Sequence, residues 1–223
     1  MKNIKAIIFD AYGTLFDVNS AAEKCKDKIG DKWEAFANYW RTTQLEYTWL
    51  RSLMKRHKDF WQITEDSLDK SMNVFKIDSS MRDELLDLYK ILSPFEEVPK
   101  VLKSLKEKNF KLAILSNGTP SLLNELVQSN NLNNLFDDIF SIEEVGVFKP
   151  DSKVYDIPVK KYKIEKNEVA FLSANTWDVS GGGNYGYNSI WVNRANNIFD
   201  KLDYQPKLEI KNLIDLLPKI DTK

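Results

Sequence analysis

Short apolar runs alternate with longer stretches of helical periodicity along most of this chain. The runs predict strands at 4–9 (IKAIIF), 110–116, 138–142, 168–173 and 188–193, and the stretches between them predict helices at about 97–108, at about 119–128, from Pro150 onward and after 173. Strands that alternate with helices of this length are typical of a parallel sheet covered by helices on both faces. We therefore predict an α/β fold with a doubly wound parallel sheet.

One long segment, residues 17–92, lacks strand periodicity. Arg41, Leu45 and Trp49 repeat every four residues, as on one face of a helix, and four of the six tryptophans fall in this segment. The prolines in SPFEEVP, residues 93–99, indicate where the sheet pattern resumes. We expect residues 17–92 to form an all-helical cap inserted after the first strand, and residues 1–16 and 93–223 to form the core.

Composition excludes several classes of function. The 32 basic and 33 acidic side chains leave a net charge of −1, so no nucleic-acid partner is expected. No signal peptide or membrane span is expected either. Cys25 is the only cysteine, which excludes an internal disulfide and is compatible with a cytoplasmic location. His57 is the only histidine, and we expect it on a surface helix in a structural role.

Polar side chains follow several of the predicted strands. They are Asp10, Ser116, Asn117, Ser173, Asn175 and Asp178, and Lys149 precedes a predicted helix. Each alone has an ordinary explanation, because Asp and Asn are common in turns and caps and Lys is usually a solvated surface charge. In an open α/β sheet, however, ligands bind beyond the carboxyl ends of the strands. The agreement of these residues on one edge predicts a small-molecule site there.

Four segments carry a family resemblance. FDAYGTLF, ILSNGTP, FKPD and LSANTWD resemble the four ordered motifs of the haloacid dehalogenase-like superfamily. The stretch WRTTQLEYTWLRSLMKRHKDF also resembles the cap of its (S)-2-haloacid dehalogenase (type II) branch. The resemblance spans essentially the whole chain. It implies an aspartate nucleophile on a Rossmann-like core with an inserted helical cap.

Two positions depart from the phosphatases that make up most of that superfamily. Those enzymes carry Asp-x-Asp in the first motif, where the second Asp is the general acid, and an acidic residue of the fourth motif helps to bind magnesium. Here Tyr12 and Ala174 stand at these positions. Magnesium prefers hard oxygen ligands, usually with one or two carboxylates. We therefore expect neither metal nor organic cofactor, and phosphoryl transfer is disfavoured.

The remaining groups suit displacement at a saturated carbon. A carboxylate that attacks an alkyl halide needs no general acid, because the halide leaves as an anion. Asp10 has to be ionised, partly desolvated and aimed at the carbon. A neighbouring Lys149 would keep Asp10 ionised and favour an anionic substrate.

The resemblance implies a hydrolytic dehalogenation of short (S)-2-haloacids to (R)-2-hydroxyacids and halide. Asp10 would attack the alpha carbon with inversion, and water would then hydrolyse the aspartyl ester. The catalytic residues implied are Asp10, Thr14, Arg41, Lys149, Ser173, Asn175 and Asp178. The substrate-binding residues implied are Tyr12, Arg41, Leu45, Phe60, Ser116, Asn117, Tyr155 and Trp177.

Among these, Ser116 would hold the substrate carboxylate and Arg41 and Asn117 the departing halide. Leu45, Phe60 and Trp177 would form the apolar wall. Arg41 could equally be a surface cation, and the aromatic residues could be core.

Two alternatives stay open at this point. One is a phosphatase-like hydrolase of the same superfamily that acts on a small phosphate ester. The other is a non-catalytic binding module that has kept the fold. The partners implied by the leading interpretation are a 2-haloacid and halide, and relatives in this branch imply a homodimer. The run Gly181–Gly183 has no functional explanation, because glycine costs about 1 kcal/mol relative to alanine in a helix.

Overall fold

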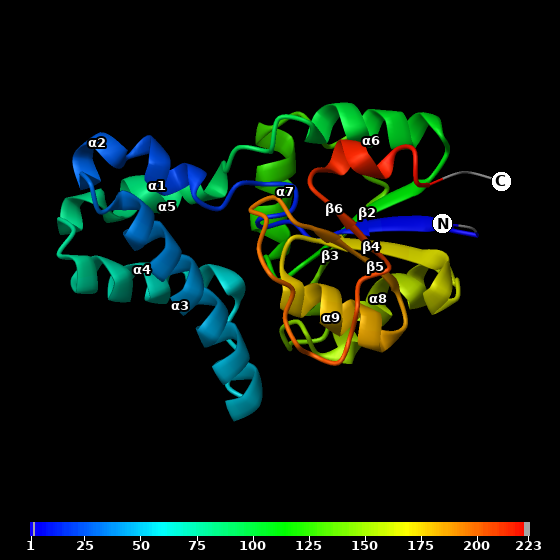
Figure 1. The fold of residues 1–223 in the computed structure, drawn as a ribbon. Coiled ribbons are helices and arrows are strands. Elements are labelled where there is room, and N and C mark those ends of the chain that lie inside the picture. Colours follow the sequence, from blue (N-terminus) through cyan, green and yellow to red (C-terminus); the bar gives the residue numbers. More distant parts are fainter. Residues whose placement is uncertain (2, 221–223) are drawn as a thin grey trace.

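A computed structural model describes residues 1 and 3–220. They contain a six-stranded, wholly parallel sheet in the order β3-β2-β1-β4-β5-β6 (Figure 1). The strands are β1 (Ala6–Phe9), β2 (Lys111–Ser116), β3 (Asp138–Ser141), β4 (Val169–Ser173), β5 (Asn188–Val192) and β6 (Leu208–Ile210). The predicted α/β fold is confirmed. The edge strand β6 was not predicted, because three residues are too few to show a periodicity.

The helices occur in two groups. Between β1 and β2 lie α1 (Ser20–Lys24), α2 (Lys26–Ile29), α3 (Trp33–Met54), α4 (Phe60–Phe75), α5 (Arg82–Lys90) and α6 (Val98–Glu107). The others are α7 (Pro120–Ser129), α8 (Ser152–Tyr162) and α9 (Thr176–Tyr185). Single 3-10 turns lie at Ser79–Met81, Ile142–Glu144, Lys166–Glu168 and Leu213–Leu216.

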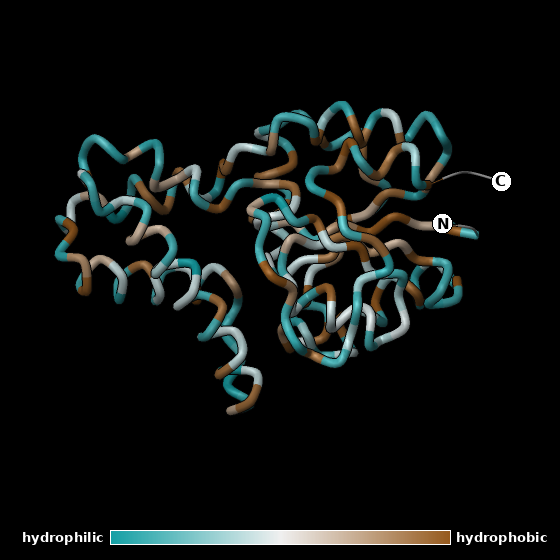
Figure 2. Tube along the Cα trace, viewed as in Figure 1, coloured by the Kyte–Doolittle hydropathy of each residue, from teal (hydrophilic) through white to brown (hydrophobic). Residues whose placement is uncertain are grey.

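The sheet forms the middle of a three-layer core. In Figure 1, α6 and α7 lie on one side of the strands and α8 and α9 on the other. β1 and β4 are buried along their whole length, as expected for parallel strands covered on both faces. Figure 2 shows the same pattern, with hydrophobic residues in the strands and hydrophilic residues on the outer turns of the helices.

Some predicted boundaries shift by one or two residues. The first strand begins at Ala6 rather than at residue 4. The helix predicted to open at Pro150 begins at Ser152, because Asp151 is its N-cap and accepts a hydrogen bond from the backbone N–H of Lys153 at 2.9 Å.

Helices α1–α5 form a separate bundle beside the sheet (Figure 1). Its interior holds aromatic residues, and Trp40 on α3 donates its indole N–H to the carbonyl of Thr64 on α4 at 3.1 Å. The bundle corresponds to the predicted cap, and its boundaries at 17 and 92 stay a prediction. No helix within residues 1 and 3–220 combines the length and the apolar character needed to cross a bilayer.

The predicted position of His57 on a surface helix is wrong. α3 ends where Lys55 adopts a left-handed conformation (φ 56°), and α4 begins after the N-cap Asp59, so His57 lies in the short connection between them. There its Nε2 lies 3.0 Å from a carboxylate oxygen of Glu143, and its ring lies 5.2 Å from that of Phe148. His57 therefore joins the helical bundle to the core.

The Gly181–Gly183 run has a packing explanation. It lies inside α9, where a Cβ on Gly181 would come 2.5 Å from Tyr155 Oη and one on Gly182 would come 2.7 Å from a ring carbon of Phe171. A Cβ on Gly183 would overlap the ring of Tyr204. These close approaches require the absence of side chains along one whole turn of the helix.

Candidate active site

Asp10 is the centre of a buried hydrogen-bond network. It follows β1 directly and is only 5% exposed. Its Oδ1 accepts a hydrogen bond from Lys149 Nζ at 3.0 Å. Its Oδ2 faces three donors: Asn175 Nδ2 at 2.8 Å, Thr14 Oγ1 at 3.2 Å and Ser173 Oγ at 3.3 Å. Both carboxylate oxygens are thus held by hydrogen-bond donors, and one of these donors is an ammonium group.

The sheet topology brings these groups together. β1 lies between β2 and β4, and the strand order reverses there, which is the usual position for a ligand site in an open α/β sheet. The backbone N–H of Asp10 donates to the carbonyl of Leu172 on β4 at 2.9 Å, so Asp10 lies beside Ser173 at the strand ends. Asn175 follows as the N-cap of α9.

A second buried carboxylate shares the lysine. Lys149 Nζ lies 2.8 Å from Asp178 Oδ2, and Tyr155 donates its hydroxyl to Asp178 Oδ1 at 2.7 Å. Burial raises the pKa of Asp178 to about 6, although Lys149 acts in the opposite direction. Burial lowers the pKa of Lys149, but Asp10 and Asp178 together outweigh it and raise that pKa above its ordinary value. Burial also raises the pKa of Tyr155 well above its usual range.

Ser116 and Asn117 lie at the end of β2. The Ser116 hydroxyl accepts a hydrogen bond from the backbone N–H of Gly118 at 3.1 Å. Asn117 Oδ1 accepts the backbone N–H of Lys149 at 3.1 Å, so the side chain of Asn117 fixes the segment that carries the lysine. The structure thus places both residues beside the predicted site.

Arg41 and Leu45 lie on α3 and line a cavity of about 500 Å³. Asn175, which donates to Asp10, also lines that cavity. Arg41 donates through Nη1 to Gln44 Oε1 at 2.8 Å. Sequence reasoning missed Gln44, although its position three residues after Arg41 on a helix was an available signal.

Tyr12 stands where the phosphatases carry their general acid, and here it packs with Phe60 in an aromatic wall. The ring of Tyr12 lies 5.2 Å from that of Phe60 and 5.7 Å from that of Tyr89, and burial raises the pKa of its hydroxyl well above the usual range. Ala174 contributes its backbone N–H, which donates to Thr14 Oγ1 at 2.8 Å. The general acid of the phosphatases is therefore replaced by a phenol ring and their fourth-motif magnesium carboxylate by a methyl group, and a site without that carboxylate does not fit the ion.

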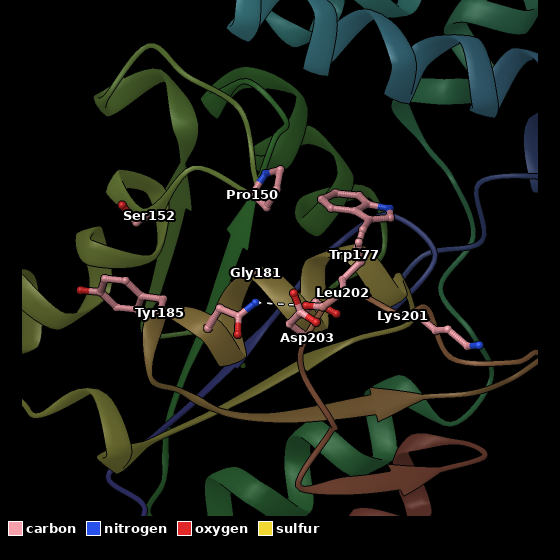
Figure 3. A pocket seen from close by; sticks show the side chains of 10 residues that line it. Pro150, Ser152, Trp177, Gly181, Tyr185, Lys201, Leu202 and Asp203 are labelled. Atoms are coloured by element: carbon pink, nitrogen blue, oxygen red, sulfur yellow. Dashed lines mark hydrogen bonds between the residues drawn. The ribbon is translucent and has the colours of Figure 1, made fainter.

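Trp177 lies on α9 and faces α3, the helix that carries Leu45. Its ring meets that of Trp49 on α3 edge to face at 5.4 Å, and it lines a groove of about 470 Å³ and, with Asn175, a second one of about 580 Å³. Figure 3 shows the first groove, with Trp177 and Pro150 near one end and Tyr185 and Ser152 near the other. Phe60 is fully buried against Phe148, with ring centroids 6.5 Å apart. That Leu45, Phe60 and Trp177 form one apolar wall stays a prediction.

Comparison with known proteins agrees with this geometry. The family model for haloacid dehalogenase-like hydrolases matches residues 4–186. An (S)-2-haloacid dehalogenase of Pseudomonas putida is 38% identical over 218 residues, which cover 97% of this chain and 96% of that protein. One of Pseudomonas sp. (strain YL) is 38% identical and covers 100% of this chain and 97% of the other.

A solved structure is similar over nearly the same length. It is the L-2-haloacid dehalogenase of Xanthobacter autotrophicus with chloropropionic acid covalently bound, which has a TM-score of 0.90 and 31% identity and covers 96% of this chain and 97% of that one. These matches extend over both the core and the helical bundle. The chain belongs to the haloacid dehalogenase-like hydrolase family, in its (S)-2-haloacid dehalogenase branch.

Proposed function

We propose that this protein hydrolyses short (S)-2-haloacids to (R)-2-hydroxyacids and halide. The observation that carries the proposal is the Asp10 carboxylate, which is almost fully buried, faces a lysine ammonium and lies in a site without the phosphatase acid. The curated relatives named (S)-2-haloacid dehalogenase support the substrate class. The chloropropionic acid bound covalently in the Xanthobacter structure supports a covalent step.

In the first step an oxygen of Asp10 attacks the alpha carbon. A carbon–oxygen bond forms, the carbon–halogen bond breaks, and the halide leaves with the electron pair. Lys149 and the donors on Oδ2 hold the two carboxylate oxygens in place before attack. Because Asp10 is only 5% exposed, it has little bulk water to displace.

The anionic substrate and the halide need a positive charge that is not already paired with the carboxylates around Asp10. Lys149 already faces two carboxylates, Asp10 and Asp178. Arg41 lines the cavity beside Asn175 and donates a hydrogen bond to a neutral amide, Gln44. We therefore assign the binding of the departing halide to Arg41. Leu45, one turn further along α3, gives the same cavity an apolar surface.

In the second step water attacks the carboxyl carbon of the Asp10 ester. Asp178 accepts one proton of that water while the water oxygen bonds to the carboxyl carbon. The bond between this carbon and the alkyl oxygen then breaks, and the departing alkoxide of the 2-hydroxyacid takes the proton back from Asp178. Asp10 returns as a carboxylate after the water's second proton passes to solvent. Burial raises the pKa of Asp178 to about 6, which makes it a stronger base than an ordinary carboxylate. Tyr155 and Lys149 hold its two oxygens in place, and Ser173 and Asn175 complete the water's surroundings.

The direct test is one turnover in heavy-oxygen water with enzyme in excess over (S)-2-chloropropanoate and with a chelator present. The proposal requires that the product hydroxyl carry ordinary oxygen and that the label enter the Asp10 carboxylate, read by mass spectrometry of the peptide. Label found only in the product would refute the ester. Asp10→Ala is expected to release no halide.

The phosphatase alternative makes an opposite prediction in the same preparation. It requires magnesium-dependent hydrolysis of a small phosphate ester and no halide release. The Tyr12 ring and the Ala174 methyl group argue against it for the reasons given above. Release of halide that is unaffected by the chelator would exclude this alternative.

We also propose a homodimer and a cytoplasmic location. The end of α3 exposes Leu50, Leu53 and Met54, and Leu53 is 80% exposed, which a second copy could cover. The single free thiol, Cys25, is buried and suits a reducing compartment. Light scattering of the wild type and of Leu53→Glu, together with cell fractionation, tests both proposals.

A further inference from the structure

Arg194 makes contacts that join three separate parts of the chain. It follows β5 after one residue, and its Nη2 donates to the backbone carbonyl of Thr14 at 2.8 Å. Its Nη1 donates to Glu97 Oε1 at 2.6 Å. The guanidinium carbon lies 3.8 Å from the ring centroid of Phe95. The side chain is therefore held by a hydrogen bond, an ion pair and an aromatic face.

The contact with Thr14 leads directly to the nucleophile. The Thr14 hydroxyl lies 3.2 Å from Asp10 Oδ2 and accepts the backbone N–H of Ala174. Between Asp10 and Thr14 the chain turns at Gly13, whose φ of +86° belongs to the left-handed region. The backbone of Thr14 is thus fixed by Arg194, while its side chain is fixed on Asp10.

Arg194 also lies at the edge of the substrate cavity. It lines the same cavity of about 500 Å³ as Arg41, Leu45 and Asn175. Its Nε is buried and has no hydrogen-bond partner among residues 1 and 3–220. Because Glu97 lies 2.6 Å from Nη1, the charge of Arg194 is largely balanced, unlike that of Arg41. The ion pair with Glu97 therefore serves to hold the guanidinium in place.

We propose that Arg194 is a positioning residue for the nucleophile: by holding the Thr14 carbonyl, it keeps the Thr14 hydroxyl on Asp10 and aims the carboxylate at the alpha carbon. This inference rests on the proposed dehalogenase function. A misplacement of about 1 Å in a reacting group costs on the order of 100-fold in rate. A lysine at this position cannot reach Thr14 and Glu97 together in the fixed fork of a guanidinium.

The test compares Arg194→Lys with the wild type in single-turnover halide release, with kcat and KM measured alongside. We expect kcat to fall by about 10- to 100-fold while KM changes by less than about threefold. Glu97→Gln is the second variant, since it keeps acceptors for Arg194 and for the backbone N–H of Leu213 but loses the charge. It should lower kcat by a smaller factor in the same direction.

Arg82→Lys is the matched control. Arg82 likewise donates two hydrogen bonds, both to the carboxylate of Asp69, but it lies in the helical bundle. The Arg82→Lys variant should change the thermal midpoint of unfolding without changing kcat.

Three results would overturn the inference: wild-type kcat in folded Arg194→Lys, a rise in KM alone, or wild-type kcat in Glu97→Gln when Arg194→Lys does not fold. Absence of halide release from the wild type would instead refute the proposed function itself.

Discussion

Lys149 Nζ lies 3.0 Å from Asp10 Oδ1 with both side chains buried, and the same ammonium lies 2.8 Å from Asp178. One cation thus balances two carboxylates in a site almost closed to water. Formation of the aspartyl ester removes the charge of Asp10 and leaves Lys149 with one charged partner. The sharing of this lysine links the two chemical steps, and most of the expected pH and mutational behaviour follows from it.

The first prediction concerns Lys149→Met. The substitution leaves two buried carboxylates without their cation, and breaking a buried ion pair on one side costs about 3 to 5 kcal/mol of unfolding free energy. Halide release should be lost because Asp10 no longer has the ammonium that holds its Oδ1 in place. Urea unfolding and a halide assay measure both effects. Lys153→Met, at an exposed position on α8, is the control, and a folded, active Lys149→Met would contradict the prediction.

The second prediction concerns the pH dependence of the ester hydrolysis. Because the pKa of Asp178 is raised to about 6, this base is protonated below that pH and ionised above it. The rate of the second step should therefore rise with pH, with its half-plateau at or below about 6, because the ester removes the Asp10 charge that helps to raise this pKa. Rapid-quench measurement of ester decay at a series of pH values checks this dependence. A rate independent of pH between about 5 and 7 would remove Asp178 as the base.

The third prediction concerns stability in the same pH range. Asp178 has a pKa of about 6 in the folded state and an ordinary value of 3.8 when exposed, so the folded state binds the extra proton between these values. Its contribution to stability is present at low pH and is lost as the pH rises through about 4 to 6. Relative to wild type, Asp178→Asn should show a flatter dependence of unfolding free energy on pH in that range. Parallel curves would contradict the prediction.

The fourth prediction concerns Arg41→Ala. Loss of the cation beside the departing halide should lower the single-turnover rate by about 100- to 1,000-fold, as for removal of a donor that stabilises developing charge. The thermal midpoint should change little, because Arg41 is partly exposed. Arg51→Ala is the control on the same helix, since Arg51 pairs with Asp66 of α4. Unfolding of Arg41→Ala would show that the residue is structural.

The fifth prediction concerns Gly183→Ala. A Cβ there overlaps the ring of Tyr204, so the variant should lose about 1 to 3 kcal/mol of unfolding free energy despite the better helix propensity of alanine. The double variant Gly183→Ala/Tyr204→Ala removes the overlap and should recover part of that loss. Chemical denaturation of the wild type and of both variants checks this. Equal stability of Gly183→Ala and wild type would contradict the prediction.

Much of the fold could be read from the chain itself. Apolar runs of four to six residues between helical stretches are local patterns, and they located β1 to β5 within one or two residues. The polar residues after β1, β2 and β4 could be assigned to one site because parallel strands present their carboxyl ends at one edge. The identity of Tyr12 and Ala174 argued against the phosphatase chemistry before any geometry was known.

Other features were decided only by contacts between distant residues. His57 contacts Glu143, 86 positions away, and Arg194 reaches Thr14, 180 positions away. The glycines of α9 are explained by rings that approach from other segments, and Trp177 on α9 meets Trp49 on α3. The periodicity of apolar residues shows which face of a helix or strand is buried, because that pattern lies in neighbouring positions of the sequence. It does not show which distant side chain contacts that face, because only the packing of the folded chain determines that contact.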